Sequence, residues 1–230
     1  KVGAALDDAT AGFQNKQTLV KENKKLQKKV DELTAENSRL TQGLTELERL
    51  QELYQLDQDY SQYDKVAANV ISKDTGNWFN SFTINKGTDD GIQKDCNVIA
   101  GSGLVGIVTE VGKNWATVRS IIDDTSNVSA MTMSTSDRCI VAGDLRLIDE
   151  GKLQFIHLKD KDNKIQEGEK IVTSDVSDKF LKGILIGYVS EIKEDPNNLT
   201  KTGTLTPVVD FEHLSEVLVI KELKQQKGDS

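Results

Sequence analysis

The most suggestive chemical motif in this chain is the glycine-rich run from Gly101 to Gly106, which has the G-x-G-x-x-G spacing of a dinucleotide-binding loop. In such a site a helix begins directly after the glycines, because its N-terminus holds the phosphate. Here the run is followed by Ile107 to Val111, whose β-branched residues predict a strand, and then by a turn at Gly112. We therefore expect no bound nucleotide and no cofactor.

Hydrolytic chemistry and metal binding have equally little support. The two histidines, His157 and His213, fall in a predicted strand and a predicted turn, and no serine stands in a nucleophile-elbow sequence. A triad assembled from distant residues is a question that sequence alone leaves open. The acidic pairs at 89–90 and 123–124 are typical of solvated turns and lack the spacing of a calcium loop. We predict no catalytic or metal site, and the chain is not expected to be an enzyme.

Composition excludes further classes of protein. The net charge of −8 over 230 residues argues against a general nucleic-acid binder. The longest apolar stretch, Ile184 to Val189, is too short to span a bilayer, and the first twelve residues do not resemble a signal peptide. Two cysteines, Cys96 and Cys139, are compatible with a disulfide or with two buried thiols.

The element that dominates the first part of the chain is a predicted long helix with a narrow apolar seam. Five leucines stand at seven-residue intervals from Leu19 to Leu47, the spacing of the d position in a coiled coil. Asparagines at two a positions fit a parallel dimer in which they pair and reject other registers. The predicted dimer interface consists of Asn23, Leu26, Val30, Leu33, Asn37, Leu40, Leu44 and Leu47.

An alternative is an amphipathic helix folded back onto its own globular domain, but such a helix has a wider apolar face. We therefore predict a coiled-coil dimerisation helix over 13–64, preceded by a flexible lead over 1–12. After Leu47 the apolar spacing shifts to Leu53, Leu56, Tyr60 and Tyr63. This shift predicts that the helix leaves its partner there and docks on the domain that follows.

Lysines are concentrated in the first part of the helix. Lys21, Lys24, Lys25 and Lys28 fall at outer positions of the coil, with Glu22 as the nearby acidic residue. They fit an ordinary solvated coil surface, and they also fit a helix end that lies near an anionic membrane.

The rest of the chain is predicted to be β structure and contains an internal repeat. Short β-branched runs separated by glycine and Asn/Asp clusters replace the helical period from Val66 onward. Four segments recur in the same order, starting at Ile92 and Ile165, Leu104 and Leu185, Ile121 and Val208, and Ser126 and Ser215. We predict two related small β-barrels over 66–146 and 147–222, with a flexible tail over 223–230. Gly106 and Gly187 lie inside corresponding strands, where a bend or bulge would help each barrel to close.

With the heptad helix in front, several of these motifs resemble the rod-shape-determining MreC family. The matching segments are Gly87 to Ile92, Gly103 to Val108, Gly168 to Ser174, Lys182 to Gly187 and Pro207 to Phe211, followed by Val217 to Ile220. The resemblance implies two six-stranded barrels of the trypsin-like-protease type without a working catalytic site.

It also implies a non-enzymatic scaffold of the cell-elongation machinery, which acts with penicillin-binding proteins, MreD and MreB to maintain rod shape. Members of this family are anchored by one transmembrane helix, so this chain would be the extracytoplasmic part, with its lysine-rich end near the membrane. The alternative function is a periplasmic-type adaptor of an efflux or secretion system. Adaptors of that kind use an antiparallel helical hairpin between β segments, whereas this chain has one heptad run before its β part.

Overall fold

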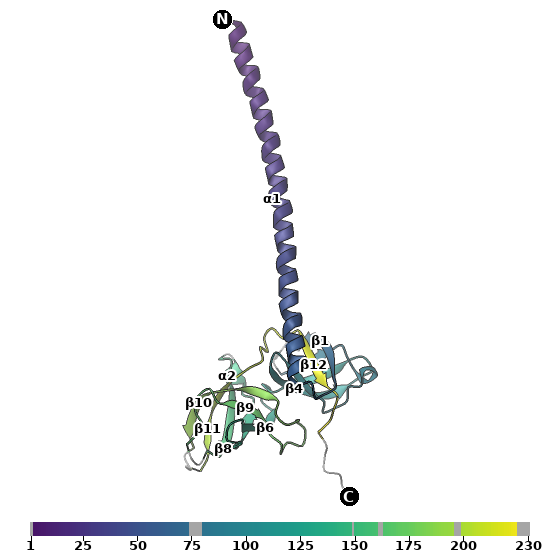
Figure 1. Cartoon of the computed structure of the whole chain (residues 1–230), viewed down its shortest axis with the longest axis vertical. Coiled ribbons are helices and arrows are strands. Elements are labelled where there is room, and N and C mark those ends of the chain that lie inside the picture. The colour runs from purple at the N-terminus through teal and green to yellow at the C-terminus, as the bar shows by residue number, and fades with distance from the viewer. Residues whose placement is uncertain (1, 74–79, 149, 161–162, 196–198, 225–230) are drawn as a thin grey trace. The chain divides into compact units, whose positions relative to one another are not determined.

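The structure, a computed structural model, describes residues 2–73, 80–148, 150–160, 163–195 and 199–224. It consists of a long helix, a mainly antiparallel β part and two very short helical turns (Figure 1). The helical elements are α1 (Val2–Asp59), the 3₁₀ turn η1 (Thr88–Asp90) and α2 (Leu145–Ile148). The strands are β1 (Lys65–Lys73), β2 (Ser81–Ile84), β3 (Asn97–Ala100), β4 (Gly103–Val111), β5 (Ala116–Ser120), β6 (Asn127–Thr132), β7 (Arg138–Ala142), β8 (Leu153–Leu158), β9 (Lys170–Thr173), β10 (Leu185–Glu194), β11 (Lys201–Pro207) and β12 (Glu216–Ile220).

The helix α1 is continuous from Val2 to Asp59 and contains no proline that would interrupt its hydrogen bonding. The prediction of a flexible lead over 1–12 is therefore wrong, and the helix ends five residues before the predicted limit at 64. A short turn follows, in which the N–H of Tyr63 donates to the carbonyl of Tyr60. The chain falls into two compact units, residues 1–51 and 52–230, so the last turns of α1 belong with the β part.

The β part forms two closed, six-stranded antiparallel barrels, which confirms the predicted fold class. Around the first barrel the strands run in the order β1, β12, β3, β4, β5, β2, and around the second in the order β10, β11, β8, β7, β6, β9. The short β-branched runs of the sequence form strands as predicted, for example β2, β4, β8 and β12. In Figure 1 the last strand, β12, lies beside β1, although the two are separated by almost the whole β part of the sequence.

The predicted barrel boundary near residue 147 is wrong, because the barrels exchange a strand. The second barrel uses the contiguous strands β6 to β11, so it begins at Asn127 and not after α2. The first barrel uses β1 to β5 and is completed by β12, which returns after the second barrel has been built. Strands β6 and β12 occupy equivalent places, since each begins just after the repeated serine, Ser126 or Ser215, and each crosses to the other barrel.

The sequence repeat extends to irregularities in the strands. In β4 an extra residue, Val105, lies between the partners of Ile99 and Val98, and the register of β10 against β9 shifts in the same way just before Gly187. Farther along, both strands shift register once more against the next strand, after Val108 in β4 and after Val189 in β10. A Cβ atom added to Gly106 or Gly187 would collide with a backbone carbonyl of the neighbouring strand, so each glycine stands where two strands approach closely.

The apolar interior consists of two clusters that share strands. Val105 and Val217 point into the first barrel, whereas Leu104 and Leu218, which precede or follow them in β4 and β12, belong to the larger cluster. That larger cluster contains the interior of the second barrel and extends over residues of the first barrel to Leu56. Because β12 is buried on both faces, it reads as a nearly continuous apolar run and not as an alternating one.

Candidate interaction surfaces

The eight residues of the predicted dimer seam all lie on α1, and the structure leaves them exposed. The six apolar members have between 51% and 62% of their surface accessible to solvent. The two asparagines, Asn23 and Asn37, are exposed as well. An uncovered apolar seam of this length is what a helix presents to a partner helix, since covering each of these side chains contributes on the order of 1–2 kcal/mol.

One asparagine of the seam, Asn37, is contacted by a threonine of the same helix. The hydroxyl of Thr41 donates to the backbone carbonyl of Asn37 over 2.9 Å and approaches the Asn37 side-chain oxygen at 3.4 Å. Pairing of the Asn37 side-chain amide across a parallel dimer stays a prediction.

The predicted docking of the end of α1 on the domain that follows is confirmed within the second unit, whereas its departure from a partner helix there stays a prediction. Leu56 and Tyr60 are buried, and Leu53 and Tyr63 are partly buried against the same apolar cluster. The shifted apolar spacing after Leu47 therefore marks the part of the helix that packs on the barrels.

Tyr60 connects the two barrels through hydrogen bonds of its hydroxyl group. The sequence predicted its packing but not these polar contacts. Its hydroxyl accepts a hydrogen bond from the N–H of Leu185 in the second barrel, at 3.1 Å, and donates to the carbonyl of Ser102 in the first, at 3.4 Å. Burial raises the pKa of this phenol, and the hydrogen bond from Leu185 partly offsets that effect. A Cβ atom at Gly103 would strike the carbonyl of Leu185, so the barrels are in close backbone contact beside this tyrosine.

Asn97 forms a second polar link between the barrels and was missed by the sequence analysis. This buried residue at the start of β3 donates from its side-chain nitrogen to the carbonyl of Lys179 over 2.9 Å. Its side-chain oxygen accepts from the N–H of Leu181 over 2.8 Å. An asparagine placed before the apolar run of β3 was the available signal, but its partners lie more than 80 residues away and could not be named from spacing.

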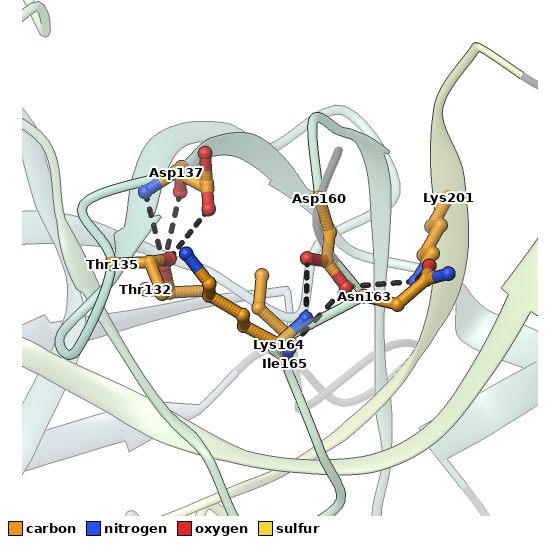
Figure 2. Close-up of polar contacts among 8 residues, drawn as sticks. All are labelled: Thr132, Thr135, Asp137, Asp160, Asn163, Lys164, Ile165 and Lys201. Carbon is orange, nitrogen blue, oxygen red and sulfur yellow. Dashed lines mark hydrogen bonds and ion pairs between the residues drawn. The ribbon is translucent and has the colours of Figure 1, made fainter.

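A third polar group lies inside the second barrel, where Asp160 is paired with Lys201 (Figure 2). The Lys201 amino group lies 2.7 Å from Asp160 Oδ2 and 2.6 Å from Asn163 Oδ1. Asp160 also accepts the backbone N–H groups of Lys164 and Ile165. Burial favours the neutral acid, but these hydrogen bonds and the lysine charge outweigh it and lower the pKa of Asp160 below its ordinary value. The carboxylate is thus fully engaged in holding a loop against β11, which is a structural role.

The residues that resembled catalytic or ligand-binding motifs lie in a strand, at the exposed end of another strand and in an exposed turn. The run after Gly101 enters β4 directly, which confirms the predicted strand in place of the helix that a dinucleotide site requires. His157 is exposed at the end of β8 with a positive φ of 58°. His213 contacts Asp210 at 2.8 Å, and both side chains are exposed. Asp210 also accepts the N–H groups of Glu212 and His213, which makes the pair part of a turn.

The two cysteines are separate buried thiols and not a disulfide. Burial raises the pKa of Cys139 to about 12 and also raises that of Cys96, so neither is suited to act as a thiolate nucleophile. Within the described residues there is no group of three or more His, Cys, Asp or Glu side chains placed to hold a metal ion. No helix in the part of the chain that the structure describes is long and apolar enough to cross a membrane.

Comparison with known proteins gives a consistent result. The family model "Rod shape-determining protein MreC, barrel core" matches residues 70–221. The cell shape-determining protein MreC of Listeria monocytogenes is 32% identical over 206 residues, which cover 87% of this chain and 68% of that protein. A solved MreC structure superposes with a TM-score of 0.68 at 26% identity and covers 77% of this chain and 98% of its own. A structure described as a complex between penicillin-binding protein PBP2 and MreC from Helicobacter pylori shares the fold, with a TM-score of 0.53 at 14% identity over 69% of this chain and all of that one.

Proposed function

The chain belongs to the MreC family of cell shape-determining proteins, and from this premise we propose that it is a non-enzymatic, dimeric scaffold of the cell-elongation machinery. In this role it organises peptidoglycan synthases at the extracytoplasmic face of the cell membrane and so maintains rod shape. The helix α1 sets the pairing of two copies, and the barrels present surfaces to the synthases.

The exposed heptad seam is the observation that carries this proposal. A helix that belonged only to a monomer would bury its apolar face against its own domain, yet residues 19–48 are all exposed. The barrels, by contrast, have complete apolar interiors and therefore need no second copy to close. Pairing through α1 would bring two sets of barrels together without altering either barrel.

The proposed partners are penicillin-binding proteins, together with MreD and MreB. Support for the first comes from the Helicobacter pylori structure, which is described as a complex of MreC with penicillin-binding protein PBP2. MreD and MreB are expected from the family resemblance. An adaptor function has no support from these comparisons, all of which lead to MreC.

Binding to an immobilised penicillin-binding protein of the elongation machinery tests the scaffold role. The intact chain should bind, and a seam variant with Leu33→Asp and Leu40→Asp should dissociate faster, because it loses the second attachment that a dimer provides. A matched control with Ala35→Asp and Gln42→Asp adds the same charges on the outer face of α1 and should behave as the wild type. Failure of the intact chain to bind synthases, with its barrels folded, would remove the scaffold proposal.

A further inference from the structure

The lysines on the outer face of α1 form a separate feature of the helix. Lys21, Lys24, Lys25 and Lys28 have the spacing i, i+3, i+4, i+7, which places them in one stripe about 10 Å long. The leucines of the seam lie on roughly the opposite side of the helix, so dimerisation would leave this stripe uncovered. We call these four residues the lysine stripe.

The lysine stripe carries positive charge that its own surroundings do not neutralise. All four side chains are exposed, and within the described residues none of them has a carboxylate partner. The neighbouring Lys29 differs, since it lies 3.8 Å from Glu32. The chain as a whole has a net charge of −8, so this stripe is a local reversal of sign and not part of a generally basic surface.

The arrangement of the stripe indicates what kind of anion it would meet. Proteins that bind single-stranded nucleic acid combine basic residues with aromatic side chains on which bases stack, and no aromatic residue occurs between Leu19 and Leu53. A short, straight row of lysines without aromatic neighbours suits a layer of phosphate headgroups, where each lysine acts as an independent point charge.

We propose that the lysine stripe is a docking surface for a bilayer rich in anionic phospholipids. The choice of a lipid surface rests on the membrane-associated location proposed above, whereas the stripe itself does not depend on dimerisation. Each lysine near such a surface should strengthen binding about fivefold, and salt should weaken the interaction because the charges are exposed.

Vesicle flotation with the intact chain tests this proposal. The protein should float with phosphatidylcholine vesicles that contain phosphatidylglycerol and not with pure phosphatidylcholine vesicles. The variant Lys21→Gln, Lys24→Gln, Lys25→Gln, Lys28→Gln should bind more weakly by about a hundredfold or more, because four roughly fivefold contributions multiply. A control variant, Lys94→Gln, Lys113→Gln, Lys159→Gln, Lys182→Gln, removes the same charge from exposed positions of the barrels and should bind as the wild type.

Three outcomes would overturn the proposal. The first is equal binding to both kinds of vesicle, and the second is an equal loss in the control variant. The third is binding to soluble polyphosphate without binding to vesicles, which would assign the stripe to a free polyanion. Circular dichroism of both variants checks that the helix persists. Sedimentation of the same samples reports the dimer separately, so a failure of the lipid proposal is distinguishable from a failure of the dimeric scaffold.

Discussion

Asp160 and Lys201 form the most completely buried ion pair in the described part of the second barrel. The Asp160 carboxylate is almost fully covered and Lys201 is 14% exposed, so removal of one partner would leave the other charged and largely shielded from water. Such a loss typically costs about 3 kcal/mol or more. The pair therefore contributes to the barrel through the loop that it holds and not through chemistry on a substrate.

Replacement of Asp160 tests that role and its pH dependence. Asp160→Asn should lower the free energy of unfolding at neutral pH by about 3 kcal/mol. Because the folded-state pKa of Asp160 lies below its ordinary value of about 3.9, the stabilisation is present above that pH and is lost as the pH falls through the folded value. Urea unfolding across acidic pH should show the wild type and the variant converging at the lowest pH. Asp178→Asn, at an exposed carboxylate, serves as the control, and a constant difference at all pH values would contradict the assignment.

The equivalent glycines Gly106 and Gly187 are predicted to be required for the close approach of neighbouring strands. Gly106→Ala should destabilise the β part by about 2 kcal/mol or more, because the new Cβ meets the backbone carbonyl of Arg119 and backbone cannot rotate away. Gly43→Ala, on α1 with open space around it, should leave unfolding of the β part unchanged. Thermal unfolding followed by near-ultraviolet circular dichroism distinguishes the two, and an unchanged melting temperature in the Gly106 variant would remove the proposed constraint.

At the level of elements, the sequence predicted which strands exist but not which barrel each one completes. The repeat at Ser126 and Ser215 correctly marked β6 and β12 as equivalent. A sequence repeat reflects which residues of a strand are buried. Which strands pair with each other depends on contacts between residues distant in sequence, such as those between β12 and β1. The predicted boundary near residue 147 divides the chain into two contiguous barrels, and it is wrong because β6 and β7 belong to the second barrel and β12 to the first. The polar links of Asn97 and Tyr60 escaped prediction for the same cause, since each joins segments more than 40 residues apart.

Strand exchange makes a prediction about removal of β12. A chain that ends at Ser215 should lose the ordered structure of the first barrel, because β1 and β3 are left with open edges. The second barrel should remain folded, since β6 to β11 are contiguous and complete. Hydrogen exchange should show lost protection confined to the first barrel, with recovery when a peptide of residues 213–224 is added. Retained protection in β1 and β3 without the peptide would contradict a structural requirement for β12.

For the whole molecule, the two units differ in how they treat their apolar residues: the β part buries them, whereas the helix exposes them. The barrels are closed, their apolar interiors are filled, and the last turns of α1 pack on them through Leu56 and Tyr60. Residues 19–48 of α1 are all exposed, and their apolar members follow a heptad pattern. The heptad pattern was readable from sequence because it depends on helical periodicity alone. The identity of the partner could not be predicted from sequence. An apolar seam indicates that some surface must cover it, but it does not specify which surface.

The central claim, that α1 pairs two copies of the chain, is tested most directly by sedimentation equilibrium. The intact chain should sediment as a dimer, and the Leu33→Asp, Leu40→Asp variant should sediment as a monomer with the β signal in circular dichroism retained. The Ala35→Asp, Gln42→Asp control should remain dimeric, because both positions lie on the outer face of the coil. A monomeric wild type, or a dimer that the seam substitutions leave intact, would contradict the account.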